Sequence, residues 1–198
     1  MKKSTFTLLF IALISLNPVF SGSNTATQSA TEVESMFFQG DMVINIGLGL
    51  GTVLYTGRAY SQRVPPMSLS LEYGYMEDFI AEDITLGLGG YLGFASAKWE
   101  SRYSNWGWDY TYIILGGRAG LHYPIVEDFD TYAGVMLGFN VVSSSSFGTV
   151  DTGRSAAGSG LVFSLYAGGR YYLSEQFAFM AEIGYGIAYL NLGIAYKL

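Results

Sequence analysis

The sequence predicts an all-β fold: an eight-stranded antiparallel up-and-down transmembrane β-barrel preceded by a signal peptide. First, apolar residues alternate with glycine, serine or charged residues along eight segments, and successive strand side chains point to opposite faces. Second, 50% of the residues are hydrophobic and 16% are aromatic, yet no run after the N-terminal segment is long enough for a membrane-spanning helix. Because lipid cannot satisfy unpaired backbone groups, closed β-structure is the remaining way to enter a bilayer.

Residues 1–23 have the form of an export signal. Lys2 and Lys3 form a charged start, Thr7–Ile14 is a short apolar run, and small residues follow at Ser21–Ser23. Residues 24–40, which begin with a polar, aperiodic stretch, are predicted to be a flexible leader. The barrel domain is assigned to residues 41–198.

Composition excludes several classes of function. The chain has no cysteine, so a lipoprotein anchor, a disulfide framework and thiol catalysis are excluded. Removal of Lys2 and Lys3 with the signal would leave 8 basic and 16 acidic residues, a net charge near −8. This charge argues against a nucleic-acid-binding protein.

The first three strands each carry large apolar residues at alternate positions. In Asp41–Gly51 these run from Met42 to Leu50, and asparagine and glycines lie between them. In Met67–Tyr75 the apolar residues alternate with serines, Glu72 and a glycine. In Ile84–Ala97 the outward set is Leu86, Leu88, Leu92 and Phe94.

The remaining five strands continue this pattern. Tyr110–Tyr123 and Thr131–Val142 place leucine, isoleucine, valine and phenylalanine outward against inward glycines. Gly160–Ile187 holds two strands joined by a turn at Leu173–Gln176. Leu190–Leu198 is the eighth strand. The predicted outward residues of the Gly160–Ile187 hairpin are Leu161, Phe163, Leu165, Ala167, Gly169, Tyr171, Phe179, Ala181, Ile183, Tyr185 and Ile187.

The connections alternate between short and long. The short ones are Tyr75–Asp83, Tyr123–Asp130 and Tyr172–Phe177; the long ones are Gly51–Pro66, Lys98–Asp109 and Ser143–Ser159; and Ala188–Tyr189 is a tight last turn. In bacterial barrels short turns face the periplasm and long loops face outward. The short turns are acidic, whereas the long loops carry several basic residues. We hypothesise that Arg58, Arg63 and Arg102 contact lipopolysaccharide phosphates, with solvated loop charge as the alternative.

A weak internal repeat supports the strand count. The sequence Glu-Asp-Phe occurs at residues 77–79 and 127–129, and Glu-Gln-Phe occurs at 175–177, each between two strands. Such a period is expected of a repeated two-strand unit.

The last strand, Asn191–Leu198 (NLGIAYKL), resembles the C-terminal signal read by the barrel-assembly machinery, with its signature at Gly193, Tyr196 and Leu198. With this strand, Asp41–Leu198 resembles the eight-stranded outer-membrane β-barrel superfamily, which includes the OmpA barrel domain and OmpX. The resemblance implies a monomer in the outer membrane of a Gram-negative bacterium, in contact with lipid and lipopolysaccharide. Leu198 departs from the pattern, which usually ends in an aromatic residue.

Four charged residues are predicted to form an ion-pair cluster in the lumen. Glu72, Arg118, Arg170 and Glu182 have inward parity and lie near the short turns. An eight-stranded barrel has an interior just wide enough for side chains, so mutual pairing is the expected solution. The cluster is predicted to be a polar plug; a gate for small ions is the alternative.

His122 is the only histidine. No serine follows it closely and no second histidine or cysteine is available, so no catalytic, cofactor or metal site is predicted. Aromatic residues gather near the long loops and are predicted to form an interfacial girdle, with a recognition surface as the alternative. These residues are Phe94, Trp99, Trp106, Trp108, Tyr110 and Phe139.

The sequence therefore predicts a non-enzymatic outer-membrane barrel with a filled polar lumen and a structural or surface-interaction role. The alternative is a narrow channel or a carrier of small apolar molecules, as in OmpW-like barrels. A lipid-modifying enzyme would need a convergent triad, and a soluble lipocalin-like barrel would need a charged outer face.

Overall fold

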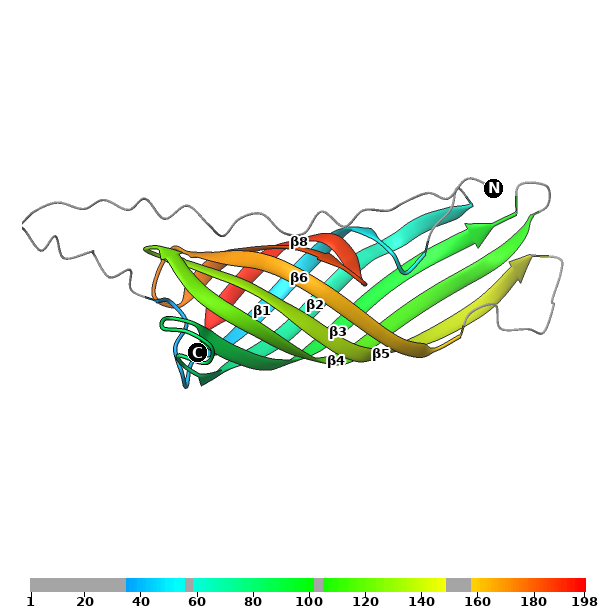
Figure 1. The fold of residues 1–198 in the computed structure, drawn as a ribbon. Coiled ribbons are helices and arrows are strands. Elements are labelled where there is room, and N and C mark those ends of the chain that lie inside the picture. The colour runs from blue at the N-terminus through cyan, green and yellow to red at the C-terminus, as the bar shows by residue number, and fades with distance from the viewer. Residues whose placement is uncertain (1–34, 56–58, 102–104, 149–157) are drawn as a thin grey trace, which may run out of the picture. The chain divides into compact units, whose positions relative to one another are not determined.

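The computed structural model describes residues 35–55, 59–101, 105–148 and 158–198. Their eight strands form one closed antiparallel barrel, in which consecutive strands pair and β1 also pairs with β8 (Figure 1). The strands are β1 (Met42–Thr52), β2 (Tyr60–Met76), β3 (Thr85–Glu100), β4 (Trp106–Val126), β5 (Phe129–Gly148), β6 (Gly160–Tyr172), β7 (Phe177–Tyr185) and β8 (Ala188–Lys197). The predicted signal peptide and residues 24–34 of the predicted leader lie outside the described residues. The described part of the chain contains no helix long and apolar enough to cross a membrane.

The polarity of the barrel is the inverse of a water-soluble one. Outward leucines and isoleucines are exposed, as shown by Leu161 at 82% and Ile183 at 65%. Inward polar residues are buried, as shown by Asn45 at 2% and Ser70 at 3%. An apolar outer wall around a polar interior is the arrangement of a membrane barrel.

Inward glycines provide room for the large side chains of the lumen. A Cβ atom on Gly134 would lie 2.6 Å from Cζ of Tyr166, and one on Gly168 would lie 2.8 Å from Cγ of Glu182. The same Cβ atoms would also meet the backbone carbonyls of Ala119 and Ala181 on the adjacent strands. Protein interiors have little spare volume, so glycine at these positions suits both the close strands and the side chains that cross the lumen.

The strands at the long-loop end are longer than predicted and of unequal length. β4 has 21 residues and β5 has 20, against 9 for β7 and 10 for β8. The β4–β5 ladder continues to the pair Trp106–Gly148, whereas β5 and β6 stop pairing at Asn140–Gly160. At the long-loop end, on the right in Figure 1, β2 to β5 therefore project as a four-stranded sheet. We call it the extension sheet and define it as residues 60–66, 96–100, 106–111 and 143–148. Large parts of the three predicted long loops are strand.

The β7–β8 turn differs from the predicted one. β7 ends at Tyr185 and β8 begins at Ala188, so Gly186 and Ile187 make the turn in place of Ala188–Tyr189. Gly186 has φ of 120°, a conformation that breaks the strand alternation. The prediction that Ile187 points outward is therefore wrong: its side chain is 6% exposed and packs inside with Ile114, Met136 and Tyr166.

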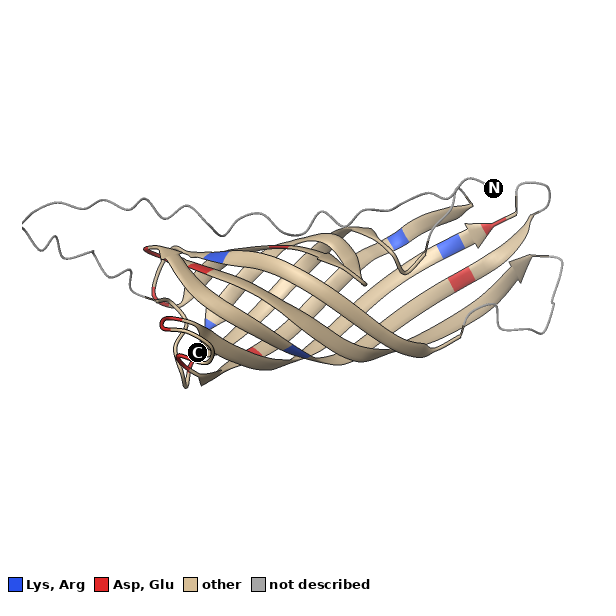
Figure 2. Cartoon of the chain, in the orientation of Figure 1, with Lys and Arg blue, Asp and Glu red and all other residues tan. Residues whose placement is uncertain are grey.

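The opposite end carries the short turns and both boundaries of the barrel domain. Acidic residues gather on these turns, as Figure 2 shows. Asp78, Asp83 and Asp128 adopt positive φ angles of 48°, 63° and 60°, which tight turns require and which aspartate tolerates. We call this the short-turn end; by the general rule for bacterial barrels it faces the periplasm.

Candidate functional site

The candidate site is the charged interior of the barrel. Glu72 lies on β2, Arg118 on β4, Arg170 on β6 and Glu182 on β7, and all four point inward. Glu72 and Arg170 are 0% exposed, Arg118 is 5% and Glu182 is 7% exposed. All four predicted residues are thus part of one buried network, arranged as two linked groups.

The first group is centred on Arg118. Its Nη2 donates to Oε1 of Glu182 at 2.7 Å, its Nε donates to the Tyr166 hydroxyl at 3.1 Å, and its Nη1 donates to Ser70 at 3.2 Å. The Tyr132 hydroxyl also donates to Oε1 of Glu182, at 2.9 Å. All three nitrogens of the guanidinium therefore have partners, as a buried cation requires.

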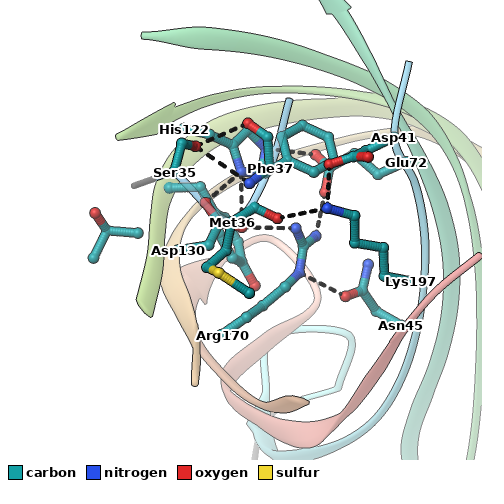
Figure 3. Close-up of polar contacts among 12 residues, drawn as sticks. Ser35, Met36, Phe37, Asp41, Asn45, Glu72, His122, Asp130, Arg170 and Lys197 are labelled. Atoms are coloured by element: carbon teal, nitrogen blue, oxygen red, sulfur yellow. Dashed lines mark hydrogen bonds and ion pairs between the residues drawn. The ribbon is translucent and has the colours of Figure 1, made fainter. Parts of the chain in front are cut away.

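The second group is centred on Arg170 (Figure 3). Its Nη2 pairs with Glu72, its Nη1 donates to Oδ2 of Asp130 at 2.9 Å, and its Nε donates to Oδ1 of Asn45 at 2.9 Å. Asn45 in turn donates to Ser70 at 3.1 Å, and Ser70 also accepts from Arg118. The hydroxyl of Ser70 thus joins the two groups.

His122 lies between two carboxylates. Its Nδ1 is 2.9 Å from Oδ1 of Asp130, and its Nε2 is 3.2 Å from Oε1 of Glu72. An imidazolium donates from both nitrogens and would satisfy both acids. In that state three cations face three carboxylates, and the charges within the network balance.

Sequence reasoning missed Asp130, which it placed in the turn before the predicted strand Thr131–Val142. β5 in fact begins at Phe129, so Asp130 has inward parity and lies directly opposite Arg170 in the β5–β6 ladder. The turn sequence held a signal that could have revealed this. Asp128 has a positive φ, which makes the turn tight and lets the strand begin at the next residue, Phe129. A tighter turn at residues 127–128 would have placed Asp130 in the strand.

Buried apolar residues lie on each side of the network. At the short-turn end Phe37 is fully buried with Val43, Tyr172, Ala178 and Ala195. At the other end Ile187 packs with Ile114, Met136 and Tyr166. Beside Arg118 and Glu182 lies a cavity of about 40 Å³, lined in part by Ser68, Ser164 and Asn191. One water molecule needs roughly 10–15 Å³ by this measure, so the space suits a few waters and no larger ligand.

The acids of the network are placed to pair with its arginines. Among the described residues, no group of three or more histidine, aspartate and glutamate side chains is placed to hold a metal ion. The acids around His122 also pair with Arg170, through Glu72 and Oδ2 of Asp130. The arrangement therefore suits mutual neutralisation in a medium where unpaired charge is costly.

The predicted girdle near the long loops is wrong for four of its six residues. Phe94 and Phe139 face outward at 39% and 46% exposure, but Trp108 and Tyr110 are 9% and 5% exposed on the inner face. Trp99 and Trp106 lie on the same face and contact each other edge to face at 5.4 Å between ring centroids. Because β3 and β4 continue unbroken into the extension sheet, strand parity places these four rings inward.

The extension sheet has the opposite polarity to the wall below it. Its inner face is aromatic, while its outer face carries the ion pairs Arg63–Asp109 at 3.2 Å and Lys98–Glu100 at 3.1 Å. Polar outside and apolar inside is the pattern of a protein surface in water. Arg58 and Arg102, the other two residues of the lipopolysaccharide hypothesis, lie outside the described residues.

The predicted assembly-signal residues lie in or next to β8. Tyr196 and Leu198 face outward at 45% and 62% exposure. Gly193 lies against β1, where a Cβ atom would approach Cα of Gly47 to 2.8 Å. The two side chains are therefore accessible on the outer wall of the finished barrel.

Comparisons with known proteins agree with this architecture. Residues 15–195 match the family model of the outer membrane protein beta-barrel domain. A comparison with curated proteins gave no match.

Solved structures with a similar fold include two crystal structures of Ail, the attachment invasion locus protein of Yersinia pestis. One is a complex with the heparin analogue sucrose octasulfate and is 16% identical; the other is 20% identical. Each alignment covers 81% of this chain and 100% of Ail, with a TM-score of 0.50. OprG from Pseudomonas aeruginosa is 12% identical over 83% of this chain and 99% of that one, with a TM-score of 0.47. The family match, the closed eight-stranded topology and the inverted polarity together establish that this chain belongs to the outer membrane protein beta-barrel domain family of bacterial outer-membrane barrels.

Proposed function

We propose that the protein is a closed, non-catalytic outer-membrane barrel that acts at the cell surface through its extension sheet and long loops. The observation that carries this proposal is the filled lumen. Arg118–Glu182 and Arg170–Glu72 cross it, with the buried Phe37 on one side and the buried Ile187 on the other. A solute would have to displace both apolar layers and separate buried ion pairs, which is costly.

The extension sheet supplies the surface for the proposed role. It stands beyond the part of the barrel that β1 and β6 to β8 enclose (Figure 1), and its outer face is suited to water. The neighbour Ail is an attachment protein that has been crystallised with a heparin analogue. For this chain, a sulfated glycan is therefore a reasonable first probe of surface binding. Lipopolysaccharide and the barrel-assembly machinery are the further partners that we propose.

The first test is conductance of the folded protein in a planar bilayer, with its folded state checked by a shift in gel mobility on boiling. We expect a heat-modifiable band and no steady current. Discrete conductance steps from a folded band would overturn the closed-barrel proposal and favour the narrow channel. Arg118→Ala serves as the sensitised variant: current in that variant alone would show that the ion pairs block the lumen of the unchanged protein.

The second test concerns the surface role. Replacing residues 97–110 by a short turn should remove the projecting β3–β4 hairpin and leave the lower ladders intact. Binding of cells to immobilised heparin and of the protein to lipopolysaccharide vesicles would then be compared with the unchanged chain. If the shortened barrel folds and neither binding differs, the extension sheet is not the interaction surface.

A further inference from the structure

The short-turn mouth of the barrel is closed by residues that precede the first strand. Phe37 is 0% exposed and packs with Val43, Tyr172, Ala178 and Ala195, which belong to β1, β6, β7 and β8. The neighbouring Phe38, in contrast, is 37% exposed. One ring of this Phe-Phe pair is therefore inside the lumen and the other is outside.

Phe37 covers the charged network directly. Its ring lies 4.1 Å from the His122 ring, centroid to centroid, and 5.6 Å from the guanidinium carbon of Arg170 (Figure 3). A cation close to the face of an aromatic ring is attracted to it, and more strongly where water is absent. The same ring thus contacts the network and separates it from the short-turn end.

The segment is held in place by contacts with both ends of the barrel sequence. Lys197 of β8 forms an ion pair with Asp41 at 2.6 Å and donates to the Met36 carbonyl at 3.3 Å. Asp41 also accepts from the Phe38 amide at 2.9 Å. Because these contacts require β8, the segment can take this position only once the barrel has closed.

A second anchor is the backbone of β2. The Gly40 amide donates to the Gly74 carbonyl at 2.8 Å, and the Gly74 amide donates to the Asp41 carbonyl at 2.9 Å. A Cβ atom on Gly74 would collide with the Phe38 backbone, 2.8 Å from its carbonyl carbon. Glycine is thus required at residue 74 for the segment to approach so closely.

From these contacts we propose that residues 35–41 are a built-in plug, centred on Phe37, that closes the short-turn mouth and blocks the passage of bulk water and small solutes from that end to the charged network. The plug is separate from the apolar layer around Ile187. Its proposed role does not depend on whether the protein binds a ligand at the cell surface. Of residues 24–40, predicted as one leader, residues 35–40 pack against the barrel, and residues 24–34 lie outside the described residues.

The absence of native cysteine allows a direct test, because an introduced cysteine is a unique probe. Ala178 is 0% exposed and contacts Phe37, so Ala178→Cys reports access past the plug. Ala95, also 0% exposed but in the aromatic cluster at the far end, gives the reference probe Ala95→Cys. Each would be treated with a small water-soluble methanethiosulfonate reagent in folded, heat-modifiable protein.

We expect Phe37→Ala to speed labelling of Ala178→Cys by roughly tenfold or more, because local opening governs access to a buried group. Phe38→Ala should leave that rate unchanged, and Ala95→Cys should stay protected in both backgrounds. Equal labelling rates of Ala178→Cys with and without the Phe37→Ala substitution would overturn the proposal. An equal rise at Ala95→Cys would also overturn it, since it would show general loosening of the barrel. Phe37→Leu provides a second variant should Phe37→Ala not fold, with an intermediate rate expected.

Discussion

The two buried arginines have partners for all three of their guanidinium nitrogens. Arg118 donates to Tyr166, Ser70 and Glu182, and Arg170 pairs with Asn45, Asp130 and Glu72. For ions buried in the lumen, the cost of desolvation is offset only if their partners stay in place. The network therefore acts as a unit, and the cost of removing one member depends on what it leaves unpaired.

Arg118→Met tests this dependence. The variant leaves Glu182 buried without its cation, so we expect a loss of about 3–5 kcal/mol in the free energy of unfolding. The double variant Arg118→Met/Glu182→Gln removes both charges and should be more stable than Arg118→Met alone. Urea unfolding in lipid vesicles, followed by tryptophan fluorescence, measures both. If the double variant loses as much free energy of unfolding as the two single substitutions together, the two ions are not coupled as the structure indicates.

The inward glycines make a second prediction for single residues. Gly134→Ala places a methyl group against the Ala119 carbonyl oxygen of β4 and 2.6 Å from Cζ of the Tyr166 ring, and we expect the resulting overpacking to cost about 1–3 kcal/mol. A methyl group on Gly90 would meet no atom within 4 Å, so Gly90→Ala is the matched control and should stay within about 0.5 kcal/mol. The temperature at which the heat-modifiable band converts would rank the two. Equal losses would mean that neither the neighbouring Ala119 carbonyl nor the Tyr166 ring requires glycine at residue 134.

At the scale of elements, the lengths of the strands separate two environments. Below the extension sheet the outer face is apolar and the inner face is charged; within it the outer face carries ion pairs and the inner face is aromatic. β3 and β4 run through both regions without a change of parity. The outer face of β3 and of β4 thus changes from apolar to charged along the strand, and this change marks where the apolar outer band ends.

The β7–β8 turn provides the test at this scale. Gly186 has φ of 120°, and a Cβ atom there would lie 2.8 Å from Cα of Ser164. Gly186→Ala should therefore cost about 1–3 kcal/mol and displace Ile187 from the lumen. Gly160→Ala, at a position with open space and no positive φ, is the control. A Gly186→Ala barrel as stable as the Gly160→Ala barrel would show that the turn tolerates other backbone conformations.

At the scale of the whole molecule, both ends of the barrel sequence meet at the short-turn end. Lys197 of β8 pairs with Asp41, and the Leu198 amide donates to the Met42 carbonyl at 2.9 Å. Closure of β1 on β8 and insertion of the plug therefore occur at the same place. The side chain of Leu198 remains 62% exposed on the outside of the barrel.

Leu198→Phe tests the proposed assembly signal. It restores the aromatic residue usual in the resembled signal, at a position with little side-chain packing to disturb. We expect a larger fraction of folded protein in the outer membrane soon after synthesis, with an unchanged unfolding free energy once folded. Pulse-labelling followed by gel mobility separates these quantities. Tyr196→Ala should have the opposite effect on the folded fraction; no response to either change would argue against a role for these two residues.

The alternation of residues was enough to predict the class of fold, the number of strands and the inward position of Glu72, Arg118, Arg170 and Glu182. These features follow from strand geometry, which is local and has a period of two. Asp130 and Ile187 escaped prediction because each lies at a turn, where one residue more or less reverses the face of a side chain.

By itself, then, the sequence determined that this chain closes into a membrane barrel with charge inside, since no other arrangement suits both faces of its strands. Only the tertiary structure decided which charges pair, that His122 and Asp130 complete the network, and that Phe37 closes one mouth. It also decided that the tryptophans near the long loops line the inside of a projecting sheet. These outcomes depend on register and on contacts between residues far apart in the chain, such as Phe37 with Ala195, and local periodicity carries no information about them.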